Sequence, residues 1–206
     1  MSDSGQIYYE PIVVSAESTV VAEFDAGTIP ATAYQSEADL AREFIQLLQS
    51  QAYAYLPITS DTQLVANLRS QLEVLNGIVF SHSEWAQFFS DRVASVNDTI
   101  EAKTIRVQED HVQLLKRDDG STKNVMLIDK ANIHNNRLQV INQYEVGQGE
   151  DGAKRSNRYD VTVLVNGLPF VHSELKRRGV DIREAFNQID RYQRDSFWAG
   201  SGLFEY

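Results

Sequence analysis

Three charged side chains in the second half of the chain have the types and spacing that phosphodiester cleavage requires. Asp160 stands at the start of one apolar run, and Glu174 and Lys176 stand at the end of the next. Side chains alternate along a strand, so Glu174 and Lys176 share one face. Two carboxylates can hold Mg²⁺, which prefers oxygen ligands and lowers the pKa of a bound water. A lysine beside the ion can orient that water or offset negative charge in the transition state.

A β-hairpin must bring these residues together. The apolar run 161–165, the Asn166-Gly167 turn signal and the returning strand 170–175 predict that hairpin. A regular two-residue turn would leave Asp160 and Glu174 on opposite faces, because side chains alternate along each strand. A shared metal site therefore requires one extra residue. We expect either a bulge with Gly167 at positive φ or a loop of odd length.

Helices are expected before the strands. One begins at Ser36, an N-cap residue with Asp39 three positions on, as in a capping box. Its apolar stripe is formed by Leu40, Phe44, Leu47 and Leu48. A second helix is expected over residues 62–75, ended by Asn76-Gly77, and a third over residues 83–96. The buried face of the third is expected to be formed by Trp85, Phe88 and Phe89.

The hydrophobic period changes to that of strands from residue 102 onward. Strands are expected at residues 104–107, 111–115, 125–128 and 140–144, with a turn at 118–120 and a glycine-rich loop at 147–156. Residues 1–33 are rich in Val, Ser and Thr and have no helical period, so we expect an extended arm or β-ribbon there. Residues 34–206 are expected to form one α/β domain with a mixed sheet.

Composition and charge limit the function classes. The chain has 206 residues and no cysteine, which excludes disulfides, thiolate metal sites and a cysteine nucleophile and suits a reducing cytoplasm. No apolar stretch has the length of a membrane span, and the N-terminus does not read as a signal peptide. The net charge of -10 argues against a surface that coats nucleic acid indiscriminately. Residues 154–194 nevertheless carry nine basic and five acidic side chains, a local basic rim.

The residues around the three charged positions resemble the PD-(D/E)xK nucleases. Asp160, Glu174 and Lys176 match the charged positions of that motif, and Tyr159 stands where the motif has proline. The run NRYDVTVLVNGLPFVHSELKRRGVDIREAFNQIDRY resembles the N-terminal nuclease domain of the R subunit of type I restriction–modification enzymes, and the resemblance covers most of the chain after residue 33. It implies a restriction-endonuclease-like mixed sheet flanked by helices, truncated at its C-terminal end. It also implies Mg²⁺ bound by Asp160 and Glu174, with Lys176 assisting the attacking water.

The family often adds an acid from the first helix to this site. Glu37 and Glu43 are the two candidates. At 100° per residue Glu37 falls among the apolar residues of that helix and Glu43 lies well to the side, so we favour Glu37 as the additional metal ligand. The alternative is that Glu37 only stabilises the helix start through the helix dipole.

The family also has a Gln-x-x-x-Tyr element after the motif, matched here by Gln188 and Tyr192. The two residues project from one helix face, and the resemblance implies that they position DNA. Arg177 and Arg178 either solvate a turn or contact a DNA phosphate. His172 shares the strand face of Glu174, but a strand histidine with no special task is the simpler interpretation.

By resemblance the intact subunit binds double-stranded DNA, joins methylation and specificity subunits, and couples ATP-driven translocation to non-specific cleavage away from the recognition site. The chain has no G-x-x-x-x-G-K-[ST] stretch, so the ATP-dependent motor is expected outside it. Two alternatives remain open. The same fold could serve as a catalytically silent docking module of that subunit, or as a repair or junction nuclease that works without a motor.

Overall fold

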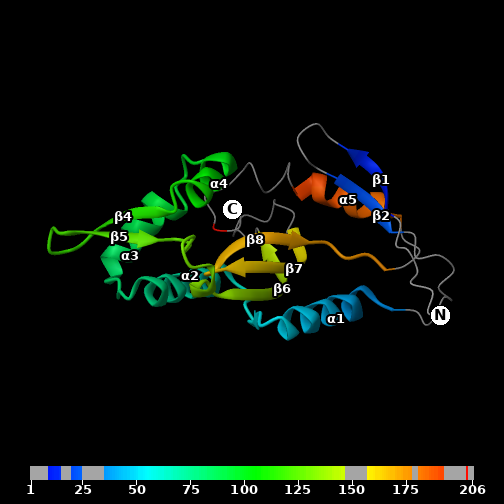
Figure 1. Ribbon diagram of the computed structural model, residues 1–206, viewed down its shortest axis with the longest axis horizontal. Coiled ribbons are helices and arrows are strands. Elements are labelled where there is room, and N and C mark those ends of the chain that lie inside the picture. The colour runs from blue at the N-terminus through cyan, green and yellow to red at the C-terminus, as the bar shows by residue number, and fades with distance from the viewer. Residues whose placement is uncertain are drawn as a thin grey trace, which may run out of the picture. The chain divides into compact units, whose positions relative to one another are not determined.

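The computed structural model describes residues 9–14, 20–24, 35–146, 157–177, 181–192 and 203 (Figure 1). The chain divides into two compact units, residues 1–34 and 35–206. In the first unit, β1 (Tyr9–Val14) and β2 (Val20–Phe24) pair antiparallel, with a shift of register between Pro11 and Val13.

The second unit is a mixed α/β structure. Its helices are α1 (Glu37–Ser50), α2 (Asp61–Asn76), α3 (His82–Phe88), α4 (Ile100–Gln108) and α5 (Ile182–Tyr192), with a 3-10 turn at Ile133–Asn135. Its main sheet has the strand order β3 (Ala54–Tyr55), β6 (Leu138–Val146), β7 (Asn157–Val165) and β8 (Leu168–Ser173). The β3–β6 pair is parallel and the others are antiparallel, so the sheet is mixed, as predicted. A separate hairpin is formed by β4 (Val112–Lys116) and β5 (Thr122–Met126).

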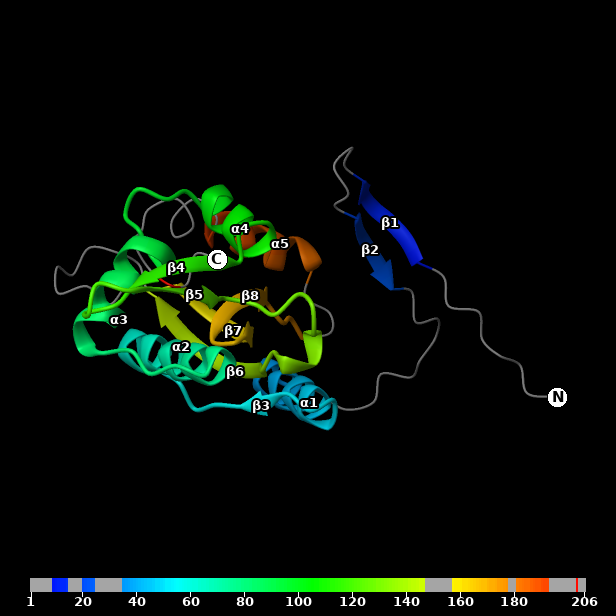
Figure 2. The same cartoon turned by 60° about the vertical axis from the view of Figure 1, so that its left-hand side comes forward.

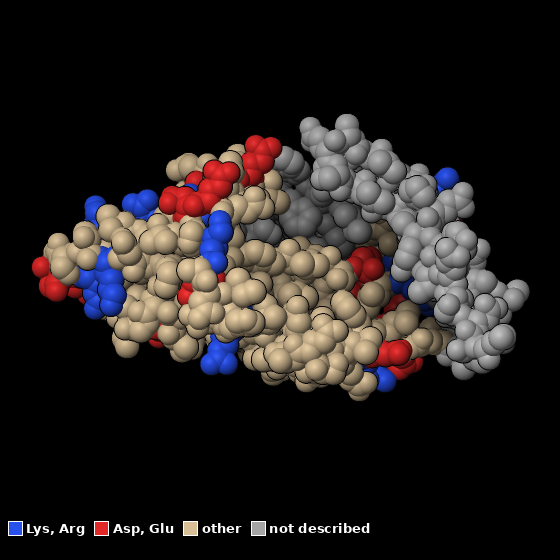
Figure 3. Space-filling view, viewed as in Figure 1, with Lys and Arg blue, Asp and Glu red and all other residues tan. Residues whose placement is uncertain are grey.

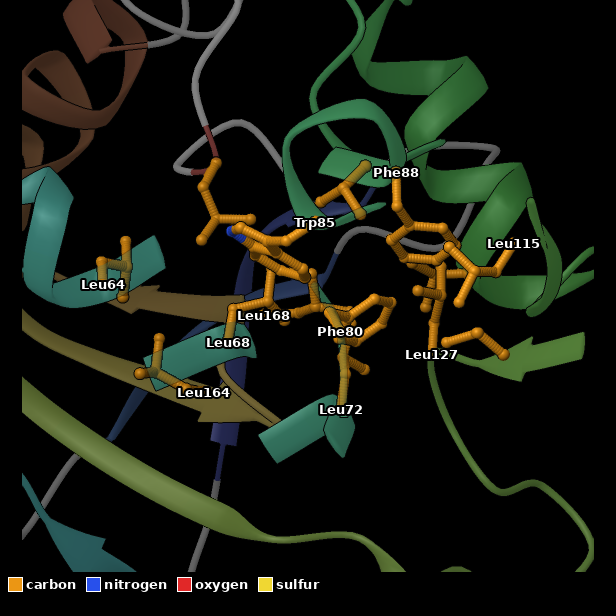
Figure 4. Packing of buried hydrophobic residues seen from close by; sticks show 14 of the residues in the cluster. Leu64, Leu68, Leu72, Phe80, Trp85, Phe88, Leu115, Leu127, Leu164 and Leu168 are labelled. Atoms are coloured by element: carbon orange, nitrogen blue, oxygen red, sulfur yellow. The ribbon is translucent and has the colours of Figure 1, made fainter. Parts of the chain in front are cut away.

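Helices cover both faces of the main sheet. Successive residues of β6 point to opposite sides, so Val140 packs with Ala41 and Ile45 of α1, whereas Ile141 belongs to the larger core. That larger core also receives Leu68 of α2, and Figure 4 shows Leu68 next to Leu168 of the β7–β8 hairpin. Figure 2 shows α1 lying along the β3–β6 side of the sheet. The predicted flanking of the sheet by helices is confirmed.

The ends of α1 and α2 follow from local sequence. Ser36 caps α1 and its hydroxyl accepts the Asp39 backbone N–H at 3.1 Å. Gly77 ends α2 in the left-handed conformation, with φ 58°. The predicted apolar stripe of α1 was wrong at Leu47, which is 55% exposed. The buried centre of that stripe is Ala41 and Ile45, four residues apart, and Leu47 lies outside it.

The strand expected at residues 104–107 is wrong, because those residues belong to α4. The β-branched residues there favoured a strand. The tertiary environment overrides that preference, since Lys103 and Val107 lie four residues apart on the buried helix face. Thr99 caps the helix and accepts the Ala102 N–H at 3.2 Å.

The third expected helix is shorter than predicted. α3 ends at Phe88 and continues as a π-helical turn, Phe89–Val93, rather than running to residue 96. Trp85 and Phe88 are buried, as predicted, and the rings of both lie beside that of Phe80. The expected loop at 147–156 lies outside the described residues. Among the described helices, none combines the length and apolar character that crossing a bilayer requires.

Candidate active site

The β7–β8 hairpin carries the extra residue that the sequence predicted. Its turn is a regular two-residue turn, with Asn166 at φ 51° and Gly167 at φ 85°. Leu164 pairs with Pro169, but Val163 pairs with Val171, so Phe170 has no partner residue on β7. The bulge therefore lies at Phe170 instead of at the turn. The register changes by one residue from that point.

This change of register brings the two acidic residues to one level. The last pair is Val161 with Ser173, where β8 ends, and continuing the same register by one step would set Asp160 opposite Glu174. The backbone N–H of Leu175 donates a hydrogen bond to Asp160 Oδ2 at 2.9 Å. Leu175 itself packs against the cluster that includes Ala41 and Ile45 of α1, and Lys176 Nζ lies 2.6 Å from Glu174 Oε1. The structure thus brings Asp160, Glu174 and Lys176 together.

The turn of this hairpin is fixed by close contacts. A Cβ on Gly167 would stand 2.6 Å from the Leu68 Cα, so only glycine allows the turn to lie against α2. Asn166 is buried, and its side chain accepts the Arg137 N–H at 2.8 Å and donates to the Leu127 carbonyl at 3.0 Å. These contacts hold the position of the turn, and through it the register of the strand pair.

Glu174 and Lys176 form an ion pair that is largely removed from solvent. Lys176 Nζ lies 2.6 Å from Glu174 Oε1, and the Glu174 side chain is only 4% exposed. Burial raises the pKa of Glu174, and repulsion from Asp160 and Glu37 adds to the rise despite the opposing effect of Lys176. Burial alone would lower the pKa of Lys176, but the hydrogen bond and charge of Glu174, with the charges of Glu37 and Asp160, raise it. Lys176 therefore stays protonated.

The donor atoms suit a hard divalent cation. Glu174 Oε2 is buried and accepts no hydrogen bond from the described residues, which is unfavourable for a carboxylate oxygen unless a ligand occupies it. Carboxylate oxygens are the ligands Mg²⁺ prefers, and Mg²⁺ binds through one or two of them while keeping several waters. Within the described part of the chain, no three His, Cys, Asp or Glu side chains gather closely enough to hold an ion by themselves. A bound ion would thus depend on Asp160, Glu174 and water.

The structure separates the two acidic candidates of the first helix. Glu37 is half-buried, one helical turn before Ala41 on the face that packs on the sheet, and its charge acts on Glu174 and Lys176. Glu43 is exposed and accepts a hydrogen bond from Gln35 at 2.8 Å. Glu37 is therefore the helix acid whose charge reaches the site, whereas its role as a metal ligand stays a prediction.

Thr162 is a residue that sequence reasoning missed. It is buried, and its hydroxyl lies 3.1 Å from Nδ1 of His172, on the sheet face of Asp160 and Glu174. The two residues are paired across β7 and β8, each two positions along the chain from a carboxylate residue of the site. Alternation along β7 places Thr162 on the face of Asp160, but its partner is identified only once the bulge is known.

The remaining predicted residues are partly described. Gln188 is half-buried on α5, whose first turn is capped by Asp181 Oδ1 accepting the Arg183 N–H at 2.9 Å. Arg177 is exposed directly after the site. The side chain of Tyr192 and all of Arg178 lie outside the described residues, so their predicted roles stay predictions. Figure 3 shows acidic and basic side chains meeting where the segment after β8 passes the start of α1.

Comparison with known proteins decides the family. Residues 34–206 match the family described as the type I restriction enzyme R protein N terminus. The chain belongs to this family. It is 42% identical over 198 residues to the type I restriction enzyme EcoprrI endonuclease subunit of Escherichia coli, a match covering 96% of the chain and 62% of that protein. It is 38% identical over 178 residues to the SsaAORF53P endonuclease subunit of Staphylococcus saprophyticus, covering 84% of the chain and 18% of that protein.

A third relative is the SauMSSORF170P endonuclease subunit of Staphylococcus aureus, 37% identical over 183 residues. The chain therefore spans less than two thirds of the length of these curated relatives. The resemblance derived from the motif is confirmed at the level of the family.

Proposed function

We propose that this R protein N-terminal chain is a Mg²⁺-dependent DNA nuclease that hydrolyses phosphodiester bonds. The observation that carries the proposal is the meeting of Asp160, Glu174 and Lys176 at the open end of one hairpin, with the buried Glu174 Oε2 lacking a hydrogen bond from the described residues. The charges of Asp160 and Glu37 act unfavourably on Glu174, and a bound cation would offset that repulsion beyond what Lys176 alone supplies.

Each residue has a distinct part in the proposed reaction. Asp160 and Glu174 would hold the ion, and Glu37 adds negative charge that favours its binding. The ion, when bound, polarises the phosphate and makes hydroxide available from water near neutral pH. The raised pKa of Lys176 keeps its ammonium charged, so it can orient the attacking water and offset charge on the phosphate. Leu175 holds Asp160 in place through its backbone N–H.

The names of the relatives support the wider role. They are endonuclease subunits of type I restriction enzymes, and we propose that this chain serves the same kind of enzyme in the cytoplasm. Double-stranded DNA is then its substrate, with methylation and specificity subunits as partners. Cleavage would be non-specific in sequence, away from the recognition site, and would follow translocation by an ATP-dependent motor outside this chain.

A second candidate is a docking module with a silent site. Two observations favour this candidate. Lys176 already forms an ion pair with Glu174, and among the described residues no three potential metal ligands lie close enough together to hold an ion. A repair or junction nuclease outside restriction enzymes is not favoured, because the chain belongs to the family described as the type I restriction enzyme R protein N terminus.

Nicking of supercoiled plasmid DNA separates the nuclease from the docking module. The chain is compared with Lys176→Ala, and with Lys123→Ala as a control at an exposed lysine of β5. The proposal expects nicking that requires Mg²⁺, falls about 100-fold in Lys176→Ala, as for loss of one transition-state donor, and is unchanged in Lys123→Ala. Equal nicking in the chain and in Lys176→Ala, or none in either, would favour the docking module.

A further inference from the structure

Strand β6 is irregular at Gln143. Its φ is 52°, in the left-handed region, although it lies inside a strand. The pairs on both sides are intact, with Asn142 opposite Val161 and Tyr144 opposite Tyr159. Gln143 therefore changes the backbone at one point without shifting the register. Its side chain and carbonyl therefore depart from the regular alternation of β6, while the pairs on both sides stay in place.

The irregular residue lies at the level of the site. The intact pairs on either side place Gln143 opposite Asp160 on β7. On the other side of Asp160, the backbone N–H of Leu175, the residue after Glu174, donates to Asp160 Oδ2.

The left-handed conformation is unfavourable for glutamine. Its Cβ approaches the following carbonyl oxygen there, and glycine would adopt the same conformation without that clash. Such a residue persists only where the surroundings fix it, and these positions are concentrated at active sites and ligand clamps. The strain at Gln143 therefore suggests a function.

The chemistry of the amide fits a phosphate. Gln143 is exposed, and its side chain makes no hydrogen bond with the described residues. The carboxylates of the site accept hydrogen bonds and repel a phosphodiester, while Lys176 is bound to Glu174. An uncharged amide can donate to a phosphate oxygen and leaves the charge at the proposed metal ligands unchanged.

We propose that Gln143 is a positioning residue that donates a hydrogen bond from its side-chain amide to a DNA phosphate beside Asp160. The inference rests on the proposed nuclease function, because it gives that site its substrate contact. The left-handed backbone directs the amide, and the strand on both sides keeps its pairing with β7.

The test separates backbone strain from the amide. Gln143→Gly removes both, Gln143→Asn keeps an amide on a residue that tolerates the left-handed region, and Gln143→Glu keeps the shape but cannot donate. Ala52→Gly is the matched control, because Ala52 is another exposed left-handed residue, with φ 69°, at the far end of α1 from Glu37. Four quantities are measured: the midpoint of thermal unfolding, the affinity for a short DNA duplex without metal, the affinity for Mg²⁺, and kcat and KM for nicking.

Gln143→Gly and Ala52→Gly are both expected to raise the unfolding midpoint, because each removes left-handed strain. DNA affinity should fall about ten-fold in Gln143→Gly, the effect of losing a hydrogen bond to a charged group, with KM raised more than kcat is lowered. Gln143→Glu should bind DNA still more weakly. Gln143→Asn should bind better than Gln143→Gly, and Ala52→Gly should bind as the unaltered chain does.

Unchanged DNA affinity in Gln143→Gly would overturn the inference, and so would a loss of Mg²⁺ affinity without a loss of DNA affinity. Lys176→Ala keeps this failure distinct from failure of the nuclease proposal. If Lys176→Ala abolishes nicking while Gln143→Gly binds DNA normally, the nuclease proposal stands and only the role of Gln143 is wrong. If no variant nicks, the DNA affinities still test Gln143.

Discussion

The backbone N–H of Leu175 donates to Asp160 Oδ2 at 2.9 Å, which ties the end of the returning strand to the start of its partner. The contact exists because Phe170 shifts the register by one residue. Without that shift Asp160 and Glu174 would lie on opposite faces of the sheet. The bulge is thus the feature on which the candidate site depends.

Deletion of Phe170 should abolish Mg²⁺ binding and leave the chain able to fold. A regular hairpin would follow, with Glu174 turned to the face opposite Asp160. Titration calorimetry with Mg²⁺ measures the loss, and circular dichroism checks the fold. Phe170→Ala is the control, because it keeps the extra backbone residue and removes a side chain that is 39% exposed. Equal Mg²⁺ affinity in the deletion and the unaltered chain would contradict the shared site.

Glu37→Gln should lower the pKa of both Glu174 and Lys176. Loss of the Glu37 charge removes repulsion that raises the pKa of Glu174 and attraction that raises the pKa of Lys176. Nuclear magnetic resonance titration of the two side chains measures both shifts. Glu43→Gln should leave both values unaltered, because Glu43 is exposed and bonded to Gln35. The reverse result would assign the helix acid of the site to Glu43.

As the pH is lowered, Mg²⁺ affinity should begin to weaken at a higher pH than it would if Glu174 had the pKa of an ordinary glutamate. Protons and Mg²⁺ compete for Glu174, and burial raises the pKa of this residue. Affinity is therefore full above the raised pKa and is lost as the pH falls through it. Calorimetry over a pH series tests this. A decline that begins only at the pH of an exposed glutamate would show that Glu174 does not control binding.

Gly167→Ala should destabilise the fold more than Gly120→Ala. Both glycines have positive φ, 85° at Gly167 and 83° at Gly120. An alanine at either position would therefore lose about 1–2 kcal/mol of stability in the left-handed conformation. Only at Gly167 would the new Cβ also meet the Leu68 backbone, whereas Gly120 has open space. Urea unfolding of the two variants gives the comparison. Equal losses of unfolding free energy would mean that α2 moves aside without cost.

The parts of the fold that depend on local chemistry could be predicted. Ser36 and Gly77 mark helix ends because a cap acts within a few residues of itself. The strand expected at residues 104–107 was wrong because burial of Lys103 and Val107 on one face of α4 outweighs strand propensity, and no local pattern reports that burial.

The candidate site could be predicted only in part from the sequence. Its three charged residues, and the need for one extra residue, followed from the alternation of side chains along strands. The location of that extra residue at Phe170 could not be predicted, because the sequence signal for the turn pointed to Gly167. In the structure Gly167 packs closely on Leu68 instead. The left-handed conformation of Gln143 could not be predicted, because glutamine does not favour that conformation and nothing in the neighbouring sequence marks the position.

The buried turn at Asn166 fixes one end of the β7–β8 hairpin. It is held by the Leu127 carbonyl, the Arg137 backbone and α2. The end that carries Asp160 is held as well, because β6 pairs with β7 as far as Val146 and Asn157, beyond Asp160. A substitution at the turn, at the opposite end of the hairpin from the carboxylates, is therefore expected to disturb the site through the register of the strands.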